Sequence, residues 1–296
     1  MAKRKTTRRS TSASKKKKEN SFWSMVAIGI IAVLTGSYTG LFKKTDGKTT
    51  TTDSASHITA LDNVSIPSSL SSQIKDYEGF KVSFNKDNGT PNWVSWELLR
   101  SETQGNLTRS DNFWQDNDLI GCPQSSDYSR SGYDRGHMCP AADQKWSSKA
   151  MNDCFVMSNM CPQAHALNAG AWSTLESKER QWAQRDSAII IVAGPIYEST
   201  DRKTIGAAGV RVPSAFFKVL LAPYLDEPRA IGFVYPNMSA PGNMQNYAMS
   251  VDEVEKLTGF DFFAALPDDI ENKVESRVSF NEWNKSKCPS YFRLIP

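Results

Sequence analysis

The stretch SGYDRGHMCP, residues 131–140, places a rare histidine beside an arginine and a glycine. His137 is one of only three histidines in the chain, and Arg135 precedes it by two positions. A histidine accepts protons near neutral pH without a large pKa shift, and arginine offers a planar cation that suits a phosphate or carboxylate. Gly136 lets a ligand approach the backbone closely. This combination predicts a site where a proton is transferred beside an anion.

The other two histidines have less suggestive surroundings. His57 lies in a segment rich in Ser and Thr, and His165 stands in the sequence PQAHALN. We interpret both as surface or structural histidines, which is the commoner role of a lone histidine.

A second segment, SNMCPQAHALNAGAWSTLESKERQW at residues 158–182, offers oxygen ligands for a metal. Its pattern predicts a helix over Asn168–Arg185, with Asn168 and Glu176 about 80° apart around the axis. Alone, Asn168 would serve as a helix N-cap and Glu176 as a solvated charge. Together they predict a site for a hard cation such as Mg²⁺, which takes oxygen ligands and keeps most of its waters. Since eight residues rise about 12 Å along a helix, Glu176 would reach the metal only through water.

The elements around these residues are short strands and few helices. A second helix is predicted at Val251–Leu257, where Ser250 and Glu253 form a capping box. Apolar runs bounded by turn residues predict strands at Phe80–Phe84, Trp93–Leu99, Phe155–Ser158, Ala188–Ala193, Phe216–Leu221 and Ala230–Tyr235. Strands and helices mix without strict alternation, which favours an α+β fold with a central, largely antiparallel sheet flanked by helices.

The first part of the chain differs in composition from the rest. Residues 3–18 contain nine Lys and Arg, and residues 22–42 then run without a charge. That run is long enough to span a bilayer core of about 30 Å, and the basic cluster before it stays in the cytoplasm. We predict a basic cytoplasmic tail at 1–21, a transmembrane signal-anchor at 22–42, a flexible linker at 43–72 and a single catalytic domain at 73–296.

This topology places the catalytic domain outside the cytoplasm, in the bacterial periplasm or at the cell surface. Two alternatives remain open. A cleaved signal peptide would release the domain. An anchor in the mitochondrial inner membrane is the other, because the first 20 residues are basic, rich in Ser and Thr and nearly free of acids.

The charge of the chain is unevenly distributed. The first 50 residues carry twelve Lys and Arg against two acids, a net charge of +10. Because the whole chain carries +3, the remaining 246 residues carry −7. Any positive potential on the folded domain must therefore be local to a groove, and the global charge is no evidence for binding nucleic acid.

The chain has five cysteines, at positions 122, 139, 154, 161 and 288. The odd number leaves at least one free or paired between chains, and the lack of a CxxC pair argues against a structural zinc site. Connectivity is not readable from the sequence. Our hypothesis is a disulfide between Cys139 and Cys161, because each precedes a proline in the two segments expected to meet.

The series DYSRSGYDRGHMCPAAD, SNMCPQ, LN and WSTLE closely resembles the DNA/RNA non-specific endonuclease family, with its His-Me finger (ββα-metal) core. GPIY at 194–197, VPSAFFKV at 212–219 and SVDEVEKLTGFDFF at 250–263 fit as well, so the resemblance covers roughly residues 75–285. Cys139 and Cys161 stand where relatives usually carry other residues. The resemblance implies an enzyme that uses Mg²⁺, or Mn²⁺ as a substitute, to hydrolyse DNA and RNA to 5′-phosphate products.

The same resemblance implies roles for single residues. His137 resembles the general base that activates water, and Asn168 resembles the direct protein ligand to Mg²⁺. Glu176 resembles the residue that holds metal-bound water.

Three further residues are candidates for support and substrate binding. Arg135 resembles the arginine that stabilises charge in the transition state and contacts the substrate. Asn159 looks like a supporting polar residue near the site. Arg109, in LTRSDNFW, resembles a further phosphate-contacting arginine.

Two other functions remain open. One is a catalytically silent nucleic-acid-binding module of the same fold, for which the acidic net charge is the only support. The other is a phosphodiesterase of small-molecule or lipid diesters, which the membrane anchor suggests. The oligomeric state is not readable, and a homodimer is among the options.

Overall fold

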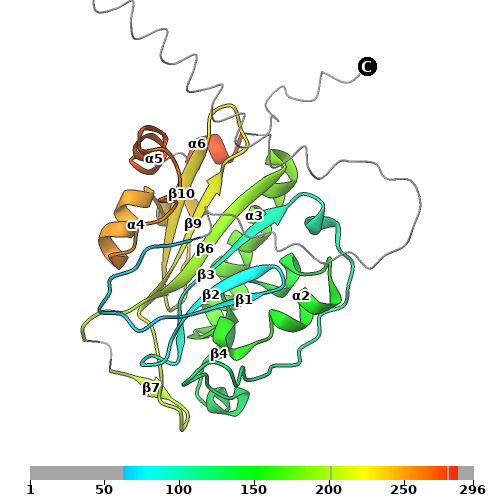
Figure 1. Cartoon of the computed structure of the whole chain (residues 1–296), viewed down its shortest axis with the longest axis vertical. Helices are drawn as coiled ribbons and strands as arrows, with labels where there is room; N and C mark the ends of the chain where they lie inside the picture. Colours follow the sequence, from blue (N-terminus) through cyan, green and yellow to red (C-terminus); the bar gives the residue numbers. More distant parts are fainter. Residues whose placement is uncertain (1–62, 201, 279, 286–296) are drawn as a thin grey trace, which may run out of the picture. The chain divides into compact units, whose positions relative to one another are not determined.

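A computed structural model describes residues 63–200, 202–278 and 280–285 (Figure 1). Its centre is a sheet of seven strands in which every neighbouring pair is antiparallel. In spatial order the strands are β1 (Gln73–Tyr77), β2 (Phe80–Asn85), β3 (Thr90–Leu99), β6 (Ala188–Ile196), β9 (Ala215–Ala222), β10 (Arg229–Pro236) and β11 (Ala248–Met249). The predicted α+β fold with a central antiparallel sheet is confirmed.

The other elements surround this sheet. Two small sheets are formed by β4 (Asp134–His137) with β5 (Met160–Gln163) and by β7 (Thr204–Ile205) with β8 (Val210–Arg211). The α-helices are α2 (Ser148–Asp153), α3 (Ser173–Asp186), α4 (Val251–Thr258), α5 (Asp268–Glu275) and α6 (Phe280–Trp283). Single helical turns of other types are η3 (Glu102–Gln104), η4 (Ser125–Tyr128), η5 (Ala141–Asp143), η6 (Met157–Asn159), η7 (Leu167–Trp172) and η8 (Met244–Tyr247).

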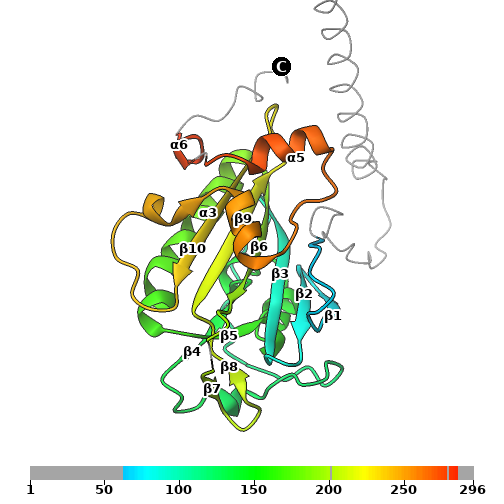
Figure 2. The same cartoon turned by 90° about the vertical axis from the view of Figure 1, so that its left-hand side faces the viewer.

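The central sheet is covered on both faces, and its strands alternate between two hydrophobic cores. On β6, Ile189 and Ile191 point into one core and Ile190 into the other. The first core includes Leu175 of α3, and the second includes Val254 of α4. Figures 1 and 2 show α3 on one side of the sheet and α4 and α5 on the other. This two-sided burial explains why the central strands are continuous apolar runs.

Five of the six predicted strands are confirmed to within a few residues as β2, β3, β6, β9 and β10. The strand predicted at Phe155–Ser158 is wrong. This segment makes one isolated bridge, between Val156 and Trp114, and turns into η6. All four of its side chains are buried. The apolar run therefore marked burial, and burial alone does not distinguish a strand from a buried turn.

The helix predicted at Asn168–Arg185 is divided in two. Residues 167–172 form the π-type turn η7, and α3 follows from Ser173. The division falls at Gly170, whose backbone angles, φ −106° and ψ −110°, are not helical. The 80° and 12 Å that relate Asn168 to Glu176 in a continuous helix therefore do not apply. The other predicted helix is confirmed as α4, with its capping box between Ser250 and Glu253.

The disulfide predicted between Cys139 and Cys161 is wrong. Both are free, as are Cys122 and Cys154, and all four thiols are buried. Cys161 pairs across the β4–β5 ladder with Gly136, three positions before Cys139. Three residues of extended chain span about 10 Å, beyond the Cα separation that a disulfide accepts. Cys288 lies outside the described residues.

In the part of the chain that the structure describes, no helix has the length and apolarity needed to cross a membrane. The tail, anchor and most of the linker predicted at residues 1–72 lie outside the described residues.

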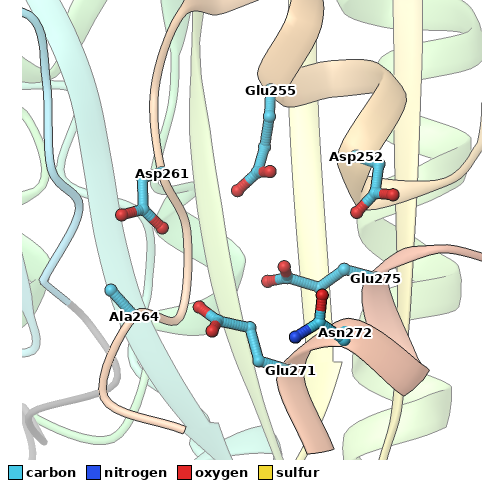
Figure 3. A pocket seen from close by; sticks show the side chains of 7 residues that line it. All are labelled: Asp252, Glu255, Asp261, Ala264, Glu271, Asn272 and Glu275. Atoms are coloured by element: carbon cyan, nitrogen blue, oxygen red, sulfur yellow. The ribbon is translucent and has the colours of Figure 1, made fainter. Parts of the chain in front are cut away.

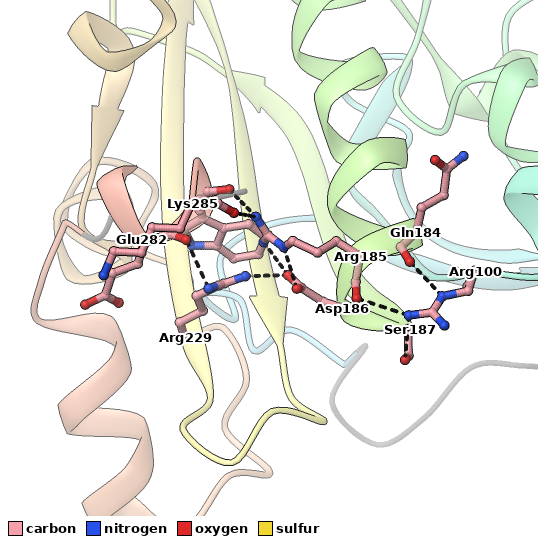
Figure 4. A network of polar contacts seen from close by, with 9 residues as sticks. Arg100, Gln184, Arg185, Asp186, Ser187, Arg229, Glu282 and Lys285 are labelled. Atoms are coloured by element: carbon pink, nitrogen blue, oxygen red, sulfur yellow. Dashed lines mark hydrogen bonds and ion pairs between the residues drawn. The ribbon is translucent and has the colours of Figure 1, made fainter. Parts of the chain in front are cut away.

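A network of polar contacts fixes the end of α3 to the C-terminal segment (Figure 4). The buried carboxylate of Asp186 contacts both Arg185 and Arg229. Arg185 also donates to the backbone oxygen of Trp283, at 2.6 Å, and Arg229 lies over the Trp283 ring. On the other side of the helix end, Arg100 donates to the backbone oxygen of Gln184. These contacts hold α3 in place against β10 and α6.

Candidate active site

The DRGH motif forms β4, which pairs with β5 in a separate two-stranded ladder. Gly136 lies opposite Cys161, and His137 lies opposite Met160. A Cβ atom at Gly136 would come within 2.4 Å of Oε1 of Gln163 and 2.5 Å of its Cβ. Glycine is therefore needed here because the two strands and the buried Gln163 leave no space for a side chain.

His137 lies in an aromatic environment. Its exposed fraction is 8%, and its ring packs edge-on against Phe155, with centroids 4.9 Å apart, and against Phe113 at 5.7 Å. The ring donates a hydrogen bond to the backbone of Arg135. The other ring nitrogen, Nε2, is buried and has no hydrogen-bond partner. The donated bond therefore comes from Nδ1, which leaves the lone pair of Nε2 available.

The pKa of His137 is far below its ordinary value. Burial lowers it to about 3, and the positive charge of Arg109 acts in the same direction. The Asp111 carboxylate and the hydrogen bond to Arg135 oppose this shift. The imidazole is consequently neutral at pH 7 and can accept a proton, and an anion bound beside it would raise its pKa.

The structure brings both predicted arginines to the same aromatic pair. The Arg109 guanidinium lies 4.8 Å from the ring centroid of Phe155, and that of Arg135 lies 5.2 Å from Phe113. Nε and Nη2 of Arg135 donate to the backbone oxygen of Ser125. Arg109 forms an ion pair with Asp111 at 2.5 Å and is half exposed. The aromatic rings thus hold two cations near the imidazole, one anchored and one exposed.

Asp134 connects the strand β4 to the turn η7. Its Oδ2 accepts a hydrogen bond from Nδ2 of Asn168 at 2.9 Å and lies 2.8 Å from Nδ1 of His165. Because Nδ2 of Asn168 is engaged, the amide oxygen Oδ1 is oriented away from Asp134. Among the described residues, no donor contacts that oxygen. His165, which the sequence suggested was a surface or structural histidine, is exposed and contacts the same carboxylate.

The next turn of chain fastens η7 and α3 to β4. Trp172 is fully buried, and its Nε1 donates to the backbone oxygen of His137 at 3.3 Å. Glu176 follows one helical turn later and is half-buried. The pKa of Glu176 is raised to about 7, chiefly by burial; Lys218 opposes the rise, and Glu179 and Asp143 contribute to it. Asn168 and Glu176 are thus placed by two contacts to β4, one at each end of η7.

Buried ion pairs link α3 to β9 and to η5. Lys218, on β9, is fully buried and contacts Oε2 of Glu179 at 2.8 Å. Its Nζ also lies 4.7 Å from the ring centroid of Trp172. Arg180 contacts the buried Asp143 at 2.9 Å. These contacts fix the rotation of α3 and hence the direction in which Glu176 points.

Asn159 is buried and holds backbone. Its Oδ1 accepts from the amide of Cys139, and its Nδ2 donates to the backbone oxygens of Cys139 and Cys154. The structure therefore places Asn159 as a brace for the chain that leaves β4. In the described structure it positions the backbone two residues after His137.

The sequence did not point to the aromatic pair or to Asp111. Phe113 and Asp111 belong to LTRSDNFW, which attracted attention only through its arginine. Asp111 has a positive φ of 54°, unusual for a residue other than glycine. Phe155 was assigned to a strand. Two aromatic residues near the motifs were the only available signal, and aromatic residues more often belong to the core.

The oxygen donors here fit a hard divalent cation. Asn168 Oδ1 accepts no hydrogen bond from the described residues and is free to bind a cation, and the hydrogen bond to the Asp134 carboxylate fixes the orientation of the amide. A site with one amide ligand suits an ion that keeps most of its waters, and oxygen ligands select Mg²⁺ or Mn²⁺ over zinc.

Comparisons with known proteins agree with this site. The model of the DNA/RNA non-specific endonuclease family matches residues 58–269. A nuclease from Nostoc sp. is 36% identical over 214 residues, which are 67% of this chain and 76% of that protein. The mitochondrial nuclease of Saccharomyces cerevisiae is 31% identical over 66% of this chain and 66% of its own length. The human mitochondrial nuclease EXOG is 32% identical over 64% of this chain and 56% of its own length.

A solved structure shares the fold. The crystal structure of the EndoG/EndoGI complex superposes with a TM-score of 0.61 at 30% identity, covering 66% of this chain and 86% of that one. The chain spans less than two thirds of the length of several curated relatives. The family model nevertheless covers most of the chain and includes every predicted site residue. The predicted resemblance is confirmed, and the chain belongs to the DNA/RNA non-specific endonuclease family.

Proposed function

We propose that this chain hydrolyses phosphodiester bonds within DNA and RNA, without sequence preference, and leaves 5′-phosphate ends. The observation that carries the proposal is the buried Nε2 of His137, which has no partner in a neutral imidazole flanked by Arg109 and Arg135. Leaving a buried nitrogen without a hydrogen-bond partner is unfavourable. The water that attacks the phosphodiester would supply the missing hydrogen bond to Nε2. The family to which the chain belongs supports the same reaction.

His137 acts as the general base in this proposal. Its Nδ1 donates to the Arg135 backbone, so Nε2 takes the proton from water as the oxygen attacks phosphorus. The bond between phosphorus and the 3′-oxygen breaks, and the 3′-oxygen leaves as a hydroxyl after it takes a proton from a water molecule. The proton converts the ring to a cation, which the negative phosphate beside it stabilises. A positioned general base contributes about 10²–10⁴-fold to the rate.

The arginines and the metal stabilise the negative charge that develops on the phosphate group in the transition state. Arg109 is the exposed cation and is expected to meet the phosphate first, whereas Arg135 is anchored by Ser125. Asn168 would hold the Mg²⁺ or Mn²⁺ ion and Glu176 one of its waters. When bound, the ion supplies Lewis-acid stabilisation of the phosphate oxygens. Contacts to the phosphate backbone alone carry no base preference, and binding should weaken steeply with salt.

The test is cleavage of supercoiled plasmid and of a structured RNA by the full-length protein, with Mg²⁺ or with EDTA. His137→Ala is expected to reduce the rate of both reactions about 10³-fold. The matched control is His57→Ala, which removes a histidine from the Ser/Thr-rich segment and should cleave normally. End-labelling of the products tests for the 5′-phosphate.

Two results would replace the proposal. A wild-type protein that binds plasmid but cleaves neither polymer in Mg²⁺ or Mn²⁺ would be a binding module. Hydrolysis of a small diester such as bis-(p-nitrophenyl) phosphate, without cleavage of either polymer, would identify a phosphodiesterase of small or lipid diesters.

We also propose that residues 22–42 anchor the chain and that the domain at 73–296 acts outside the cytoplasm. The support is the uncharged run after a basic cluster. The relatives include mitochondrial nucleases and a bacterial nuclease. Protease added to intact cells or mitoplasts should remove the domain, and fractionation should leave the chain with membranes.

A further inference from the structure

A pocket on the far face of the sheet from His137 is lined by acidic side chains. Its volume is about 370 Å³, and it lies between α4, α5 and the segment that joins them. The acidic residues in its lining are Asp252, Glu255, Asp261, Glu271 and Glu275. Figure 3 shows the carboxylates of Glu255, Glu271 and Glu275 directed into the same space.

Three of these carboxylates are close enough to share one ion. One oxygen from each of Asp252, Glu255 and Glu275 lies within 4.8 Å of the others. Two of the residues come from α4 and the third from the last turn of α5. Residues from two separate helices thus converge on one point.

No cation in the described residues balances this charge. Neither lysine nor arginine lies within ion-pair distance of the five carboxylates in the described part of the chain. Among the described residues, the backbone amide of Phe262 donates a hydrogen bond to Oε1 of Glu255, at 2.9 Å. Like charges at this spacing repel, so the pocket favours either a bound cation or protonation of its acids.

Glu275 is the residue that points to a ligand. Its exposed fraction is 4%, and its Oε1 is buried without a hydrogen-bond partner. The side chain extends into the pocket in Figure 3. A buried carboxylate oxygen without a partner is strongly unfavourable. Burial and, after it, the neighbouring carboxylates raise the pKa of Glu275 to about 9.

We propose that this pocket binds a divalent cation of the Ca²⁺ class, held directly by Asp252, Glu255 and Glu275. Ca²⁺ accepts six to eight oxygen ligands in flexible geometry, whereas Mg²⁺ demands a near-ideal octahedron and gives up its waters reluctantly. Several carboxylates from two helices suit the first ion better. Glu271 and Asp261 contribute further negative charge at the rim.

The bound ion would join α4 to α5 and hold both helices against the second core. Val254 of α4 and Val274 of α5 both belong to that core. The site is therefore structural in its effect and lies on the other side of the sheet from the proposed nuclease site. It does not depend on the proposed reaction.

The experiment measures the thermal midpoint of the full-length protein, stripped with EDTA and then given Ca²⁺ or Mg²⁺ at constant ionic strength. Millimolar Ca²⁺ should raise Tm by about 5 °C, as expected for an ion present well above its Kd. Glu255→Gln/Glu275→Gln should abolish this response. Asp269→Asn removes an exposed charge from the first turn of α5 and serves as the matched control, with the response retained.

Asn168→Ala separates this site from the proposed catalytic metal. It should keep the Ca²⁺ response while losing nuclease activity. The proposal is overturned if Ca²⁺ leaves Tm unchanged, if the double variant responds like the wild type, or if Asn168→Ala alone removes the response. Should the double variant fail to fold, Glu275→Gln is used with equilibrium dialysis against CaCl₂, where loss of one bound ion per chain is expected.

Discussion

The two faces of the central sheet treat buried acids in opposite ways. On the α3 face, Asp143 contacts Arg180, Glu179 contacts Lys218, and Asp186 contacts Arg185 and Arg229. On the α4 and α5 face, Glu275 is as deeply buried but has no such partner among the described residues. The acids of the α3 face pair with lysine and arginine side chains of the same chain. The acids of the α4 and α5 face would take their counter-charge from an ion in solution.

This difference distinguishes acids that stabilise the fold from acids that are available to bind a ligand. A carboxylate whose cation comes from the same chain keeps its counter-charge whatever the solution contains, although Oε1 of Glu179 is itself buried without a hydrogen-bond partner. A carboxylate without such a cation makes stability depend on what the solution contains. In the proposed nuclease site, the buried atom without a partner is instead a neutral nitrogen, Nε2 of His137. It lies between arginines, and this setting suits a water molecule that binds next to an anion.

The largest effect is expected from breaking the pairing on the α3 face. Lys218→Met would leave Glu179 buried and unpaired, as Glu275 is now. Removing one partner of a buried pair costs about 3–5 kcal/mol, and the loss also removes the ammonium from the Trp172 ring. Urea unfolding should report this decrease in the free energy of unfolding. The double variant Glu179→Gln/Lys218→Met removes both charges and should recover much of the loss, and no recovery would show that packing, not charge, is responsible.

Much of this architecture is predictable from the sequence, but the pairing is not. The strands of both cores are apolar runs, and the capping box of α4 is local, so pattern alone found them. The motif residues of the candidate site could also be named from the sequence, because each lies in a distinctive local stretch, and their roles stay predictions. Lys218, by contrast, stands in FFKVLL as a lone charge in a strand. Its partner is 39 positions away, and only the fold brings them together.

Long-range and backbone effects explain the errors. The kink at Gly170 arises because η7 is tied at both ends to β4, through Asn168 and Trp172, a constraint that helical periodicity does not contain. The short strands β4 and β5 are too brief to show an alternating pattern. The acidic residues of α4 and α5 read as solvated surface, because nothing in either helix alone predicts their convergence.

A second prediction contrasts indirect and direct use of carboxylates. Asp134 orients the Asn168 amide at 2.9 Å, whereas the acids of the pocket are proposed to bind their ion directly. Asp134→Asn should raise the Mg²⁺ concentration for half-maximal cleavage about 10–100-fold, the usual loss when the hydrogen-bond partner that orients a metal ligand is removed. The Ca²⁺ response of Tm should be unchanged. The exposed Asp87→Asn is the matched control, and a normal Mg²⁺ requirement in Asp134→Asn would disprove the orienting role.

The third prediction is that removing an acid from the pocket stabilises the protein, whereas removing a charge on the α3 face destabilises it. In EDTA at pH 8, Glu275→Gln should raise the free energy of unfolding by about 1–2 kcal/mol, because the wild-type carboxylate must take up a proton or bury its charge on folding, whereas the amide is neutral in both states. The pKa of Glu275 is raised to about 9, so the folded protein binds the proton more tightly than the unfolded chain does. Wild-type stability should therefore fall as pH rises from about 5 to 9, by up to about 1.4 kcal/mol per pH unit. Denaturant titrations across that range should show a flatter profile for the variant. A profile identical to that of the wild type would mean that Glu275 is stabilised by a partner.

The smallest effect comes from the cap of α4 and tests whether the pocket acts through its ligands. The Ser250 hydroxyl accepts from the Glu253 amide at 3.2 Å, and the Glu253 carboxylate accepts from the Ser250 amide at 2.8 Å. Ser250→Ala removes the first bond and should cost about 1 kcal/mol. Because Ser250 is not a ligand, this loss should be the same in EDTA and in Ca²⁺, whereas Glu275→Gln should stabilise in EDTA and destabilise in Ca²⁺. Chemical unfolding of both variants under both conditions checks the contrast. If the cap variant changed sign as well, the response to Ca²⁺ would be a general property of α4, and the distinction between the two faces would fail.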